Sequence, residues 1–322
     1  MSGLSLVELL VSLFLGVLLS SAMVATYLSS KQGYLYDEQM ARMQENGRYA
    51  TRLLTRELSM AGFFGGALSM ESTPAGIVAG DCADQPWALV AMPYLDFVDD
   101  FSGTAQPVSL NEISYKCMDA ADISSGSDIV AIKRTATEAS LRWGVPLSDL
   151  TASRGQQWYL RQRDSQLPQW ERLRPLDLLD ASKTIPGLSY WEAVAKIYFI
   201  RSHSYTRGDG VPSLCMETLA GNSMTSRCLV EGLENMQLEF GIDTDADGVA
   251  NHYTAAPSPD ELQQAVTAKI HLLLRSLSQM TGYVNNSVYS LGKTQVQASG
   301  DGYLRRVYST AVPLGGWVQP LG

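Results

Sequence analysis

The sequence contains none of the short motifs that mark common catalytic sites. It has no H-E-x-x-H zinc motif, no G-x-S-x-G nucleophile elbow, no P-loop and no G-x-G-x-x-G dinucleotide fingerprint. Its three histidines, His203, His252 and His271, lie far apart, and His271 sits in an apolar run typical of a structural histidine. We therefore expect a non-catalytic protein that requires no cofactor, although an active site assembled from distant residues would leave no such motif.

Positive charge is also scarce. The chain has 24 Lys and Arg residues against 33 Asp and Glu residues, which gives a formal net charge of −9, and it has no block of basic residues. A dedicated nucleic-acid partner is not expected, because binding to phosphates needs a basic face that displaces counterions. Hydrophobic residues make up 45% of the chain and charged residues 18%, a composition that excludes the disordered and collagen-like classes.

Cysteine is rare, and no two of the four cysteines have the C-x-x-C spacing of a zinc or redox site. Four cysteines allow three disulfide connectivities. We favour Cys82–Cys117 and Cys215–Cys228 because each pair closes a short loop, with four buried free thiols as the alternative. Disulfides would place the folded part of the chain in an oxidising compartment such as the periplasm.

The longest apolar run begins near the N-terminus, and from Leu4 to Leu28 its only charged residue is Glu8. A helix over these residues would be about 37 Å long, which is enough to cross the hydrocarbon of a bilayer. A cleaved secretory signal would have a basic start, whereas Met1-Ser2-Gly3 contains no Lys or Arg. Residues 4–28 are therefore predicted to span a membrane.

A helical period continues beyond this run but becomes amphipathic. The apolar residues that recur at spacings of three, four and seven are Tyr36, Met40, Met43, Ala50, Leu54, Leu58 and Ala61. Charged residues occupy the positions between them, and Gly62, Gly65 and Gly66 follow. The pattern predicts one continuous rod, apolar over residues 4–28 and amphipathic over residues 29–62.

The stretch from Gly3 to Glu8, followed by an apolar run, resembles the class III signal of type IV pilins and type II secretion pseudopilins. The resemblance implies that residues 1–3 are a leader, that a prepilin peptidase cuts after Gly3, and that Leu4 becomes the N-methylated first residue. It also implies that Glu8 meets the new α-amine of a neighbouring subunit. The alternative is that Glu8 only reaches toward the lipid headgroups from its place near the membrane end.

Past Gly66 the periodicity changes to alternating or β-branched runs, which predict strands. We expect an α+β protein, with the long stalk helix followed by a β-rich antiparallel head over residues 63–322 and no linker between independent domains. The predicted strands are Asp128–Arg134, Gln157–Gln162, Ala195–Arg201, Met236–Ile242, Val266–Leu274 and Tyr303–Val312. Residues 138–190 resist assignment, and their tryptophans are expected to be core or loop anchors.

The sequence "DTDADGVAN" at 243–251 places Asp243, Asp245 and Asp247 at alternate positions before a glycine. One tight loop of this kind can direct several oxygens at a hard cation, with Val249 adding its carbonyl and Asn251 a side-chain or water-mediated ligand. The match to an EF-hand is partial, because Thr254 stands at the twelfth position, where a Glu is usual. We predict Ca²⁺ binding, with an ion-free acidic turn as the alternative.

Three further stretches resemble the PilW type of large minor pilin: "ENGRYATRLLTRELSMAGFFG" at 45–65, "IHLLLRSLS" at 270–278 and "YLRRVYSTAVPLGG" at 303–316. The resemblance implies a structural protein of a tip or priming complex that starts type IV pilus assembly and supports twitching motility and adhesion. Its implied partners are other minor pilins and the major pilin through the stalk, the inner-membrane assembly platform and a large tip adhesin.

The resemblance also implies a single-pass inner-membrane protein with a periplasmic head before assembly and a place in the pilus afterwards. Two alternatives remain at this point. A type II secretion pseudopilin would carry the same stalk, and a membrane-anchored periplasmic binding or enzymatic domain would never enter a filament.

Overall fold

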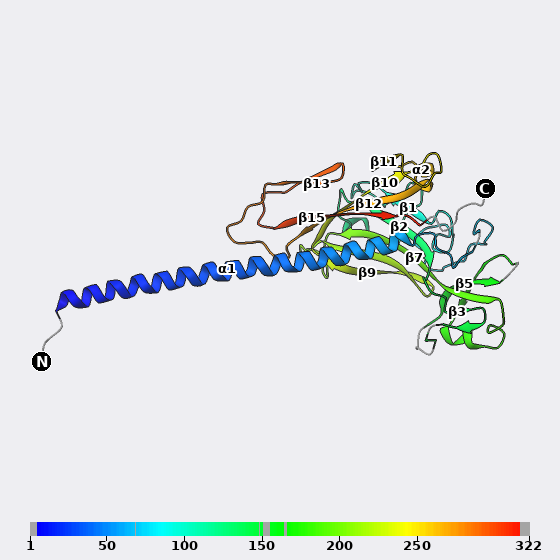
Figure 1. The fold of residues 1–322 in the computed structure, drawn as a ribbon, viewed down its shortest axis with the longest axis horizontal. Helices are drawn as coiled ribbons and strands as arrows, with labels where there is room; N and C mark the ends of the chain where they lie inside the picture. Colours follow the sequence, from blue (N-terminus) through cyan, green and yellow to red (C-terminus); the bar gives the residue numbers. More distant parts are fainter. Residues whose placement is uncertain (1–4, 68, 148, 151–154, 164–165, 316–322) are drawn as a thin grey trace.

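The computed structural model describes residues 5–67, 69–147, 149–150, 155–163 and 166–315. One helix, α1 (Leu6–Ser59), extends far out of a globular head, as Figure 1 shows. Its buried residues begin only at Met43, and residues 5–37 are exposed. The predicted combination of a stalk helix with a β-rich head is confirmed.

The ends of α1 follow from local sequence. The helix contains no proline, and Ser5 is its N-cap. At the other end the helix stops at Ser59, earlier than the predicted residue 62. Gly62 adopts a left-handed φ of 81°, which a helix cannot continue through. Its N–H donates to the Lys133 carbonyl of the head, 3.0 Å away, rather than to a carbonyl of the helix.

The larger sheet has nine strands, and every ladder in it is antiparallel. The long strand β7 (Leu188–Arg201) lies between β2 (Ile129–Thr135) and β8 (Ser213–Ala220), which are flanked by β1 (Leu95–Val98) and β9 (Ser223–Glu231). The N-terminal half of β7 pairs with β5 (Gln157–Arg163) and with the short β3 (Leu141–Arg142). Their hairpin partners are β6 (Gln169–Leu173) and β4 (Val145–Pro146).

The second sheet has the order β11-β10-β12-β15 and is also antiparallel. Its strands are His252–Thr254, Leu233–Ile242, Ala265–Arg275 and Arg305–Pro313, respectively. A separate hairpin joins β13 (Val288–Leu291) to β14 (Thr294–Gln297). Three short helices complete the described residues: η1 (Ala120–Asp122), η2 (Pro175–Leu179) and α2 (Pro259–Gln263).

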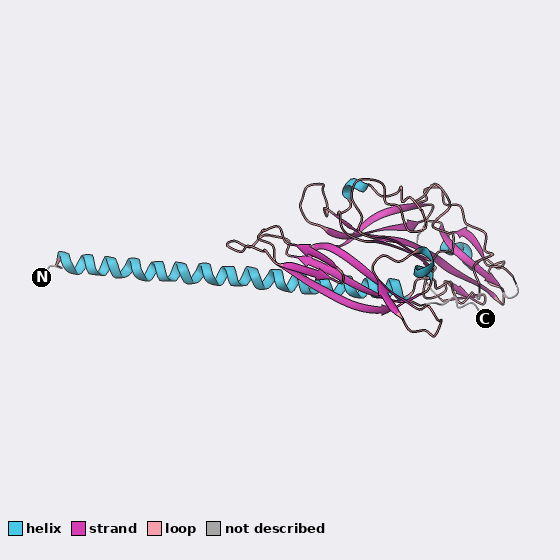
Figure 2. Ribbon diagram, turned by 90° about the horizontal axis from the view of Figure 1, so that it is seen from above, coloured by secondary structure: helices cyan, strands magenta, loops and turns pink. Residues whose placement is uncertain are grey.

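The main core lies where the C-terminal half of α1 meets both sheets. Ala50, Leu54 and Leu58 of the helix belong to the same buried cluster as Phe97 of the larger sheet and Phe240 of the second. The two phenylalanine rings meet edge to face with centroids 5.1 Å apart. Figure 2 shows the C-terminal part of the helix lying alongside strands of the head. The amphipathic part of the stalk is therefore a component of the head's core.

All six predicted strands are present, each with bounds shifted by a few residues. The largest difference is β7, which begins at Leu188 rather than Ala195. The unassigned stretch 138–190 forms β3 to β6, η2 and the start of β7. The tryptophans are expected to be core or loop anchors, and Trp143 is not a core residue: it lies on a hairpin turn with a φ of 51° and is 63% exposed.

Candidate functional sites

The N-terminal processing site lies at the edge of the described chain. Gly3 and Leu4 fall outside the described residues, whereas Glu8 lies in the first turn of α1. The Ser5 N–H donates to Glu8 Oε2 at 2.9 Å, and the Val7 N–H donates to Ser5 Oγ at 3.3 Å. Ser5 and Glu8 thus form a capping box, in which the carboxylate satisfies a backbone donor of its own helix.

This arrangement gives Glu8 a role that our sequence reasoning missed. The S-x-x-E spacing of Ser5 and Glu8 was visible in the sequence and is a known signature of a helix N-terminus. A carboxylate at this end is also favoured by the helix dipole. One oxygen of Glu8 is occupied within the isolated subunit, and the carboxylate has further lone pairs for another donor.

The apolar half of α1 is exposed along its whole length. In the described part of the chain, α1 is the one helix long and apolar enough to cross a membrane, judged by length and composition alone. None of the most apolar window is buried inside the molecule. An exposed apolar surface of this size calls for lipid or other apolar helices around it.

The junction between stalk and head contains a buried cluster of charges. Glu57 of α1 accepts hydrogen bonds from Arg134 of β2, at 3.2 Å from Nε and 2.9 Å from Nη2, and from Lys196 Nζ of β7 at 2.8 Å. Burial alone would raise the pKa of Glu57, but the charges of Arg134 and Lys196 outweigh it and hold the pKa below its ordinary value. The stalk is therefore fixed to the larger sheet by an ionised carboxylate with hydrogen bonds to both of its oxygens.

Polar contacts and a close approach fix the neighbouring turns of α1. Asn46 Nδ2 donates to the Glu231 carbonyl at 3.0 Å, and Gln39 Oε1 accepts from the Leu277 N–H at 3.1 Å. The ring of Tyr308 covers Gly47 so closely that a Cβ there would lie 2.6 Å from it. The stalk is thus held in one rotational position relative to the head.

The predicted cation loop follows β10 directly. Asp243, Asp245 and Asp247 each place a carboxylate oxygen within 4.8 Å of the others. Asp243 is buried and accepts from the N–H groups of Gly248, at 2.7 Å, and Asp245, at 3.3 Å. Desolvation acts to raise the pKa of Asp243, but hydrogen bonds, first that from the Gly248 N–H and then one with the Asp245 side chain, hold it below its ordinary value.

The donor set of the loop fits a hard cation in part. Three convergent carboxylates are the ligands that Ca²⁺ prefers. Asn251, however, uses its Oδ1 to accept from the Thr244 N–H at 2.6 Å and the Thr244 hydroxyl at 3.0 Å, so this side chain closes the loop. The three aspartates are the residues that could hold Ca²⁺, while the ligand roles of Val249 and Asn251 remain predictions.

A second acidic group went undetected in the sequence. Asp99 and Asp100 meet Asp128, although 28 residues separate Asp100 from Asp128. Both oxygens of the buried Asp128 accept backbone N–H groups, from Asp100 at 3.0 Å and from Leu238 at 2.7 Å. The two N–H donors act to lower the pKa of Asp128, but burial outweighs them and raises it to about 8. These bonds tie the two sheets together, which is a structural role.

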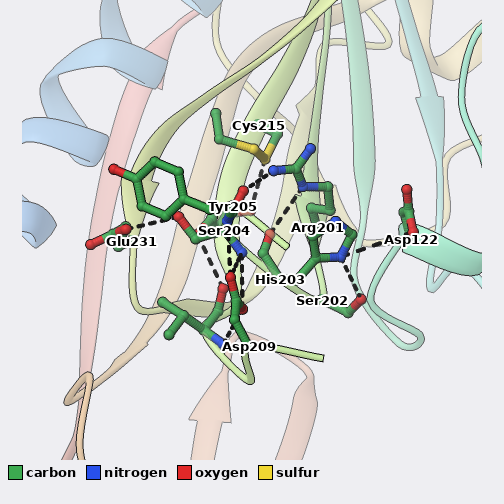
Figure 3. The surroundings of a disulfide bond; sticks show 12 residues. Asp122, Arg201, Ser202, His203, Ser204, Tyr205, Asp209, Cys215 and Glu231 are labelled. Atoms are coloured by element: carbon green, nitrogen blue, oxygen red, sulfur yellow. Dashed lines mark hydrogen bonds and ion pairs between the residues drawn. A yellow bond between two sulfur atoms is a disulfide. The ribbon is translucent and has the colours of Figure 1, made fainter. Parts of the chain in front are cut away.

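The disulfides are Cys82–Cys117 and Cys215–Cys228, the favoured pairing, and no cysteine is left free. Cys215 and Cys228 face each other across β8 and β9. Figure 3 shows the neighbouring loop, where the Asp209 carboxylate accepts from the N–H groups of Ser204 and Tyr205 at 3.1 and 2.9 Å. The Val211 N–H also donates to this carboxylate, at 2.9 Å, and contributes most to lowering the pKa of Asp209, which these backbone bonds together hold down to about 2. The loop is thus fixed by its own backbone.

The same neighbourhood brings a histidine, a serine and an aspartate together. The His203 ring has polar contacts with Ser202 Oγ at 3.5 Å and with Asp122 Oδ1 at 3.9 Å, and both involve Nδ1 (Figure 3). A catalytic triad uses opposite ring nitrogens for the serine and the aspartate. The three residues therefore do not have the geometry of a proton relay.

Comparison with known proteins bears mainly on the C-terminal part of the head. Residues 197–315 match the family described as Type IV Pilus-assembly protein W, PilW. The match runs from within β7 through β15, contains the stretch at 270–278 and overlaps that at 303–316, which confirms the resemblance to PilW. It does not extend to α1.

A solved structure with similarity to the chain is the type IV-like pilin TTHA1219 from Thermus thermophilus. The sequence identity is 10%, the TM-score is 0.39, and the alignment covers 86% of this chain and 98% of the other. No curated protein sequence matches the chain.

Proposed function

We propose that this chain, whose residues 197–315 match the PilW family, is a minor pilin of a type IV pilus. One observation carries the proposal: a single helix is bare and apolar over its N-terminal half and built into the head over the other half. Such a subunit can exchange lipid for the apolar helices of other subunits without any change in its head. The function is structural rather than catalytic.

Processing would create the partner of Glu8. A prepilin peptidase would cut after Gly3, and Leu4 would become the N-methylated first residue, with a new α-amine. A charged residue within a membrane helix costs roughly 2.5–3.5 kcal/mol on insertion scales. Opposite charges about 4 Å apart at an effective dielectric near 20 attract by about 4 kcal/mol before desolvation. Pairing of Glu8 with a neighbour's amine would therefore set register, while packing of the apolar helices supplies most of the association energy.

In this proposal the chain is held in the inner membrane by α1, with its head in the periplasm, until it joins other minor pilins in a priming or tip complex. The major pilin would then add to that complex through the inner-membrane assembly platform, and a large tip adhesin is a further partner. Twitching motility and adhesion would depend on the resulting pilus. Ca²⁺ at Asp243, Asp245 and Asp247 would stiffen the head without taking part in chemistry.

The test is a deletion strain complemented with Glu8→Ala. We expect the variant to insert into the membrane and to be cleaved after Gly3, as measured by mass spectrometry of the mature N-terminus, while surface piliation falls. Glu45→Ala, on the exposed side of the same helix, is the matched control and should restore piliation fully. Normal piliation with Glu8→Ala would contradict the role of this carboxylate.

The deletion strain also separates this function from that of a type II secretion pseudopilin. Loss of surface pili with normal enzyme secretion is the outcome we expect, because the matched family is one of pilus assembly. Loss of enzyme secretion with normal pili would assign the same stalk to the secretion system. An N-terminus that remains uncut would count against both assignments and favour an anchored periplasmic domain.

A further inference from the structure

The loop between β12 and β13, residues 276–287, lies at the base of the head. It extends farther toward the N-terminal end of α1 than the other described parts of the head, as Figures 1 and 2 both show. Its first residues are fixed to the stalk, where the Leu277 N–H donates to Gln39 Oε1. The loop therefore lies beside the part of α1 that emerges from the apolar run.

At the tip of this loop a polar residue is buried while its two apolar neighbours are exposed. Asn285 is only 1% exposed, and its Nδ2 donates to the Tyr289 hydroxyl and to the Tyr303 carbonyl, both at 2.9 Å. The preceding Val284 is 63% exposed, and Tyr283 is 38% exposed. The buried asparagine holds the loop in a conformation that presents Tyr283 and Val284 outward, which is unfavourable unless something other than water covers them.

Charge is missing from the same segment. No charged residue occurs from Ser276 to Gly292, between Arg275 and Lys293. At the chain's average of 18% charged residues, a stretch of this length would hold about three. Surface loops normally carry such charges, so their absence fits a surface that is close to apolar material.

The position of the loop along the stalk identifies that material. Residues 9–30 of α1 are uncharged, and at about 1.5 Å per residue they span about 33 Å, close to the thickness of the bilayer hydrocarbon. Tyr34 and Tyr36 follow and are exposed. Exposed aromatic residues at such positions typically anchor membrane helices at the level of the lipid headgroups. Gln39 lies about 14 Å beyond Ser30, and the loop turns back from it toward the headgroups.

We propose that Tyr283, Val284 and the exposed Val288 rest on the lipid headgroup surface of the membrane that α1 spans. The inference rests on the proposed membrane anchoring of the unassembled subunit. A tyrosine and two valines suit this interface, because a tyrosine ring has an apolar body with a polar tip and the valines can enter the boundary with the acyl chains. Contact at two places, the helix and the loop, would hold the head at a fixed tilt to the bilayer before it enters a filament.

The experiment uses the full chain reconstituted in vesicles of phosphatidylethanolamine and phosphatidylglycerol. Val284 is replaced by the photoreactive residue p-benzoylphenylalanine, and after irradiation the adducts are identified by mass spectrometry. Val249 is the matched control because it is also a valine and is 65% exposed. It lies in the loop after β10, at the end of the β10–β12 ladder opposite to Arg275, about 36 Å away for eleven residues of strand.

We expect phospholipid adducts from position 284 and none from position 249. Vesicle flotation without lipid adducts at 284 would overturn the inference and leave the anchoring intact. Adducts to a second copy of the chain at 284, in place of lipid, would also overturn it, since the loop would then be a subunit contact. Failure to float with the vesicles would contradict the anchoring itself, and the inference with it.

Discussion

Replacing Glu57 by glutamine tests how the stalk is joined to the head. The substitution keeps the shape of the side chain but removes its charge. Arg134 and Lys196, whose side chains are only 7% and 17% exposed, would then lack their counter-charge in the junction. Residues 5–37 at the other end of the helix are exposed, so the effect should be confined to the docked half of α1.

The magnitude follows from the burial of this cluster. Removing one partner of a buried ion pair typically destabilises a protein by about 3–5 kcal/mol, because a buried charge is left uncompensated. Glutamine can still accept one hydrogen bond from Arg134, so we expect the lower end, about 3 kcal/mol. For a domain of this size each kcal/mol lowers Tm by about 2–4 °C, which gives a decrease of about 6–12 °C.

The same cluster predicts a pH dependence. The pKa of Glu57 in the folded protein lies below its ordinary value of 4.5. The stabilisation from its ionised form is therefore complete above pH 4.5 and is lost as the pH falls through the folded pKa. The difference in Tm between the native chain and Glu57→Gln should shrink as the pH is lowered below that value.

The assay is thermal unfolding of the full chain in detergent micelles, followed by near-ultraviolet circular dichroism, at pH 7 and at pH values below 4.5. Glu45→Gln is the control, because Glu45 is exposed on the same helix and exposed charges contribute little. A Tm for Glu57→Gln that equals that of the control at pH 7 would refute the reasoning. So would a Tm difference that is unchanged at low pH.

Three further perturbations give distinct results. Gly47→Ala should destabilise the docked helix by about 1–3 kcal/mol because its Cβ meets a tyrosine ring, whereas Gly33→Ala, with open space around it, should stabilise the helix by up to about 1 kcal/mol. Thermal denaturation of both variants checks the opposite signs. Adding 5 mM Ca²⁺ to chelator-treated protein should stabilise the head by about 1–2 kcal/mol if the dissociation constant is about 10⁻⁴–10⁻³ M, and Asp245→Asn should abolish the shift in Tm. The double substitution Cys215→Ser and Cys228→Ser should lower the free energy of unfolding, measured by urea denaturation, by about 3 kcal/mol. An unchanged midpoint would show that this disulfide does not stabilise the head.

The parts of the fold that the sequence predicted are those with local causes. The stalk helix follows from a period of apolar residues, and strands such as β2 and β10 follow from β-branched or alternating runs. β9 was missed because its outward residues are polar and its burial depends on the neighbouring β8. β3 and β4 have two residues each, and such short segments carry no period.

The candidate sites divide in the same way. Asp243, Asp245 and Asp247 lie within five consecutive residues, so their spacing alone predicted that they converge. The charge cluster at the junction was not predictable, because Glu57 meets Arg134 across 77 residues and Lys196 across 139. Asp128 was hidden for the same reason. Contacts between distant segments depend on topology, which a single sequence does not reveal.

The capping box at Ser5 and Glu8 has a consequence for the subunit before it finds a neighbour. If α1 spans the membrane as proposed, the Glu8 carboxylate would enter the bilayer with one hydrogen bond from its own backbone already made, which would lower the penalty for its insertion. In the proposed assembly, a neighbour's amine would either displace this internal donor or share the carboxylate with it. Glu8 would in that case exchange a hydrogen bond within its own helix for one to the neighbouring subunit. The strength of its bond to Ser5 would then influence how readily the exchange occurs.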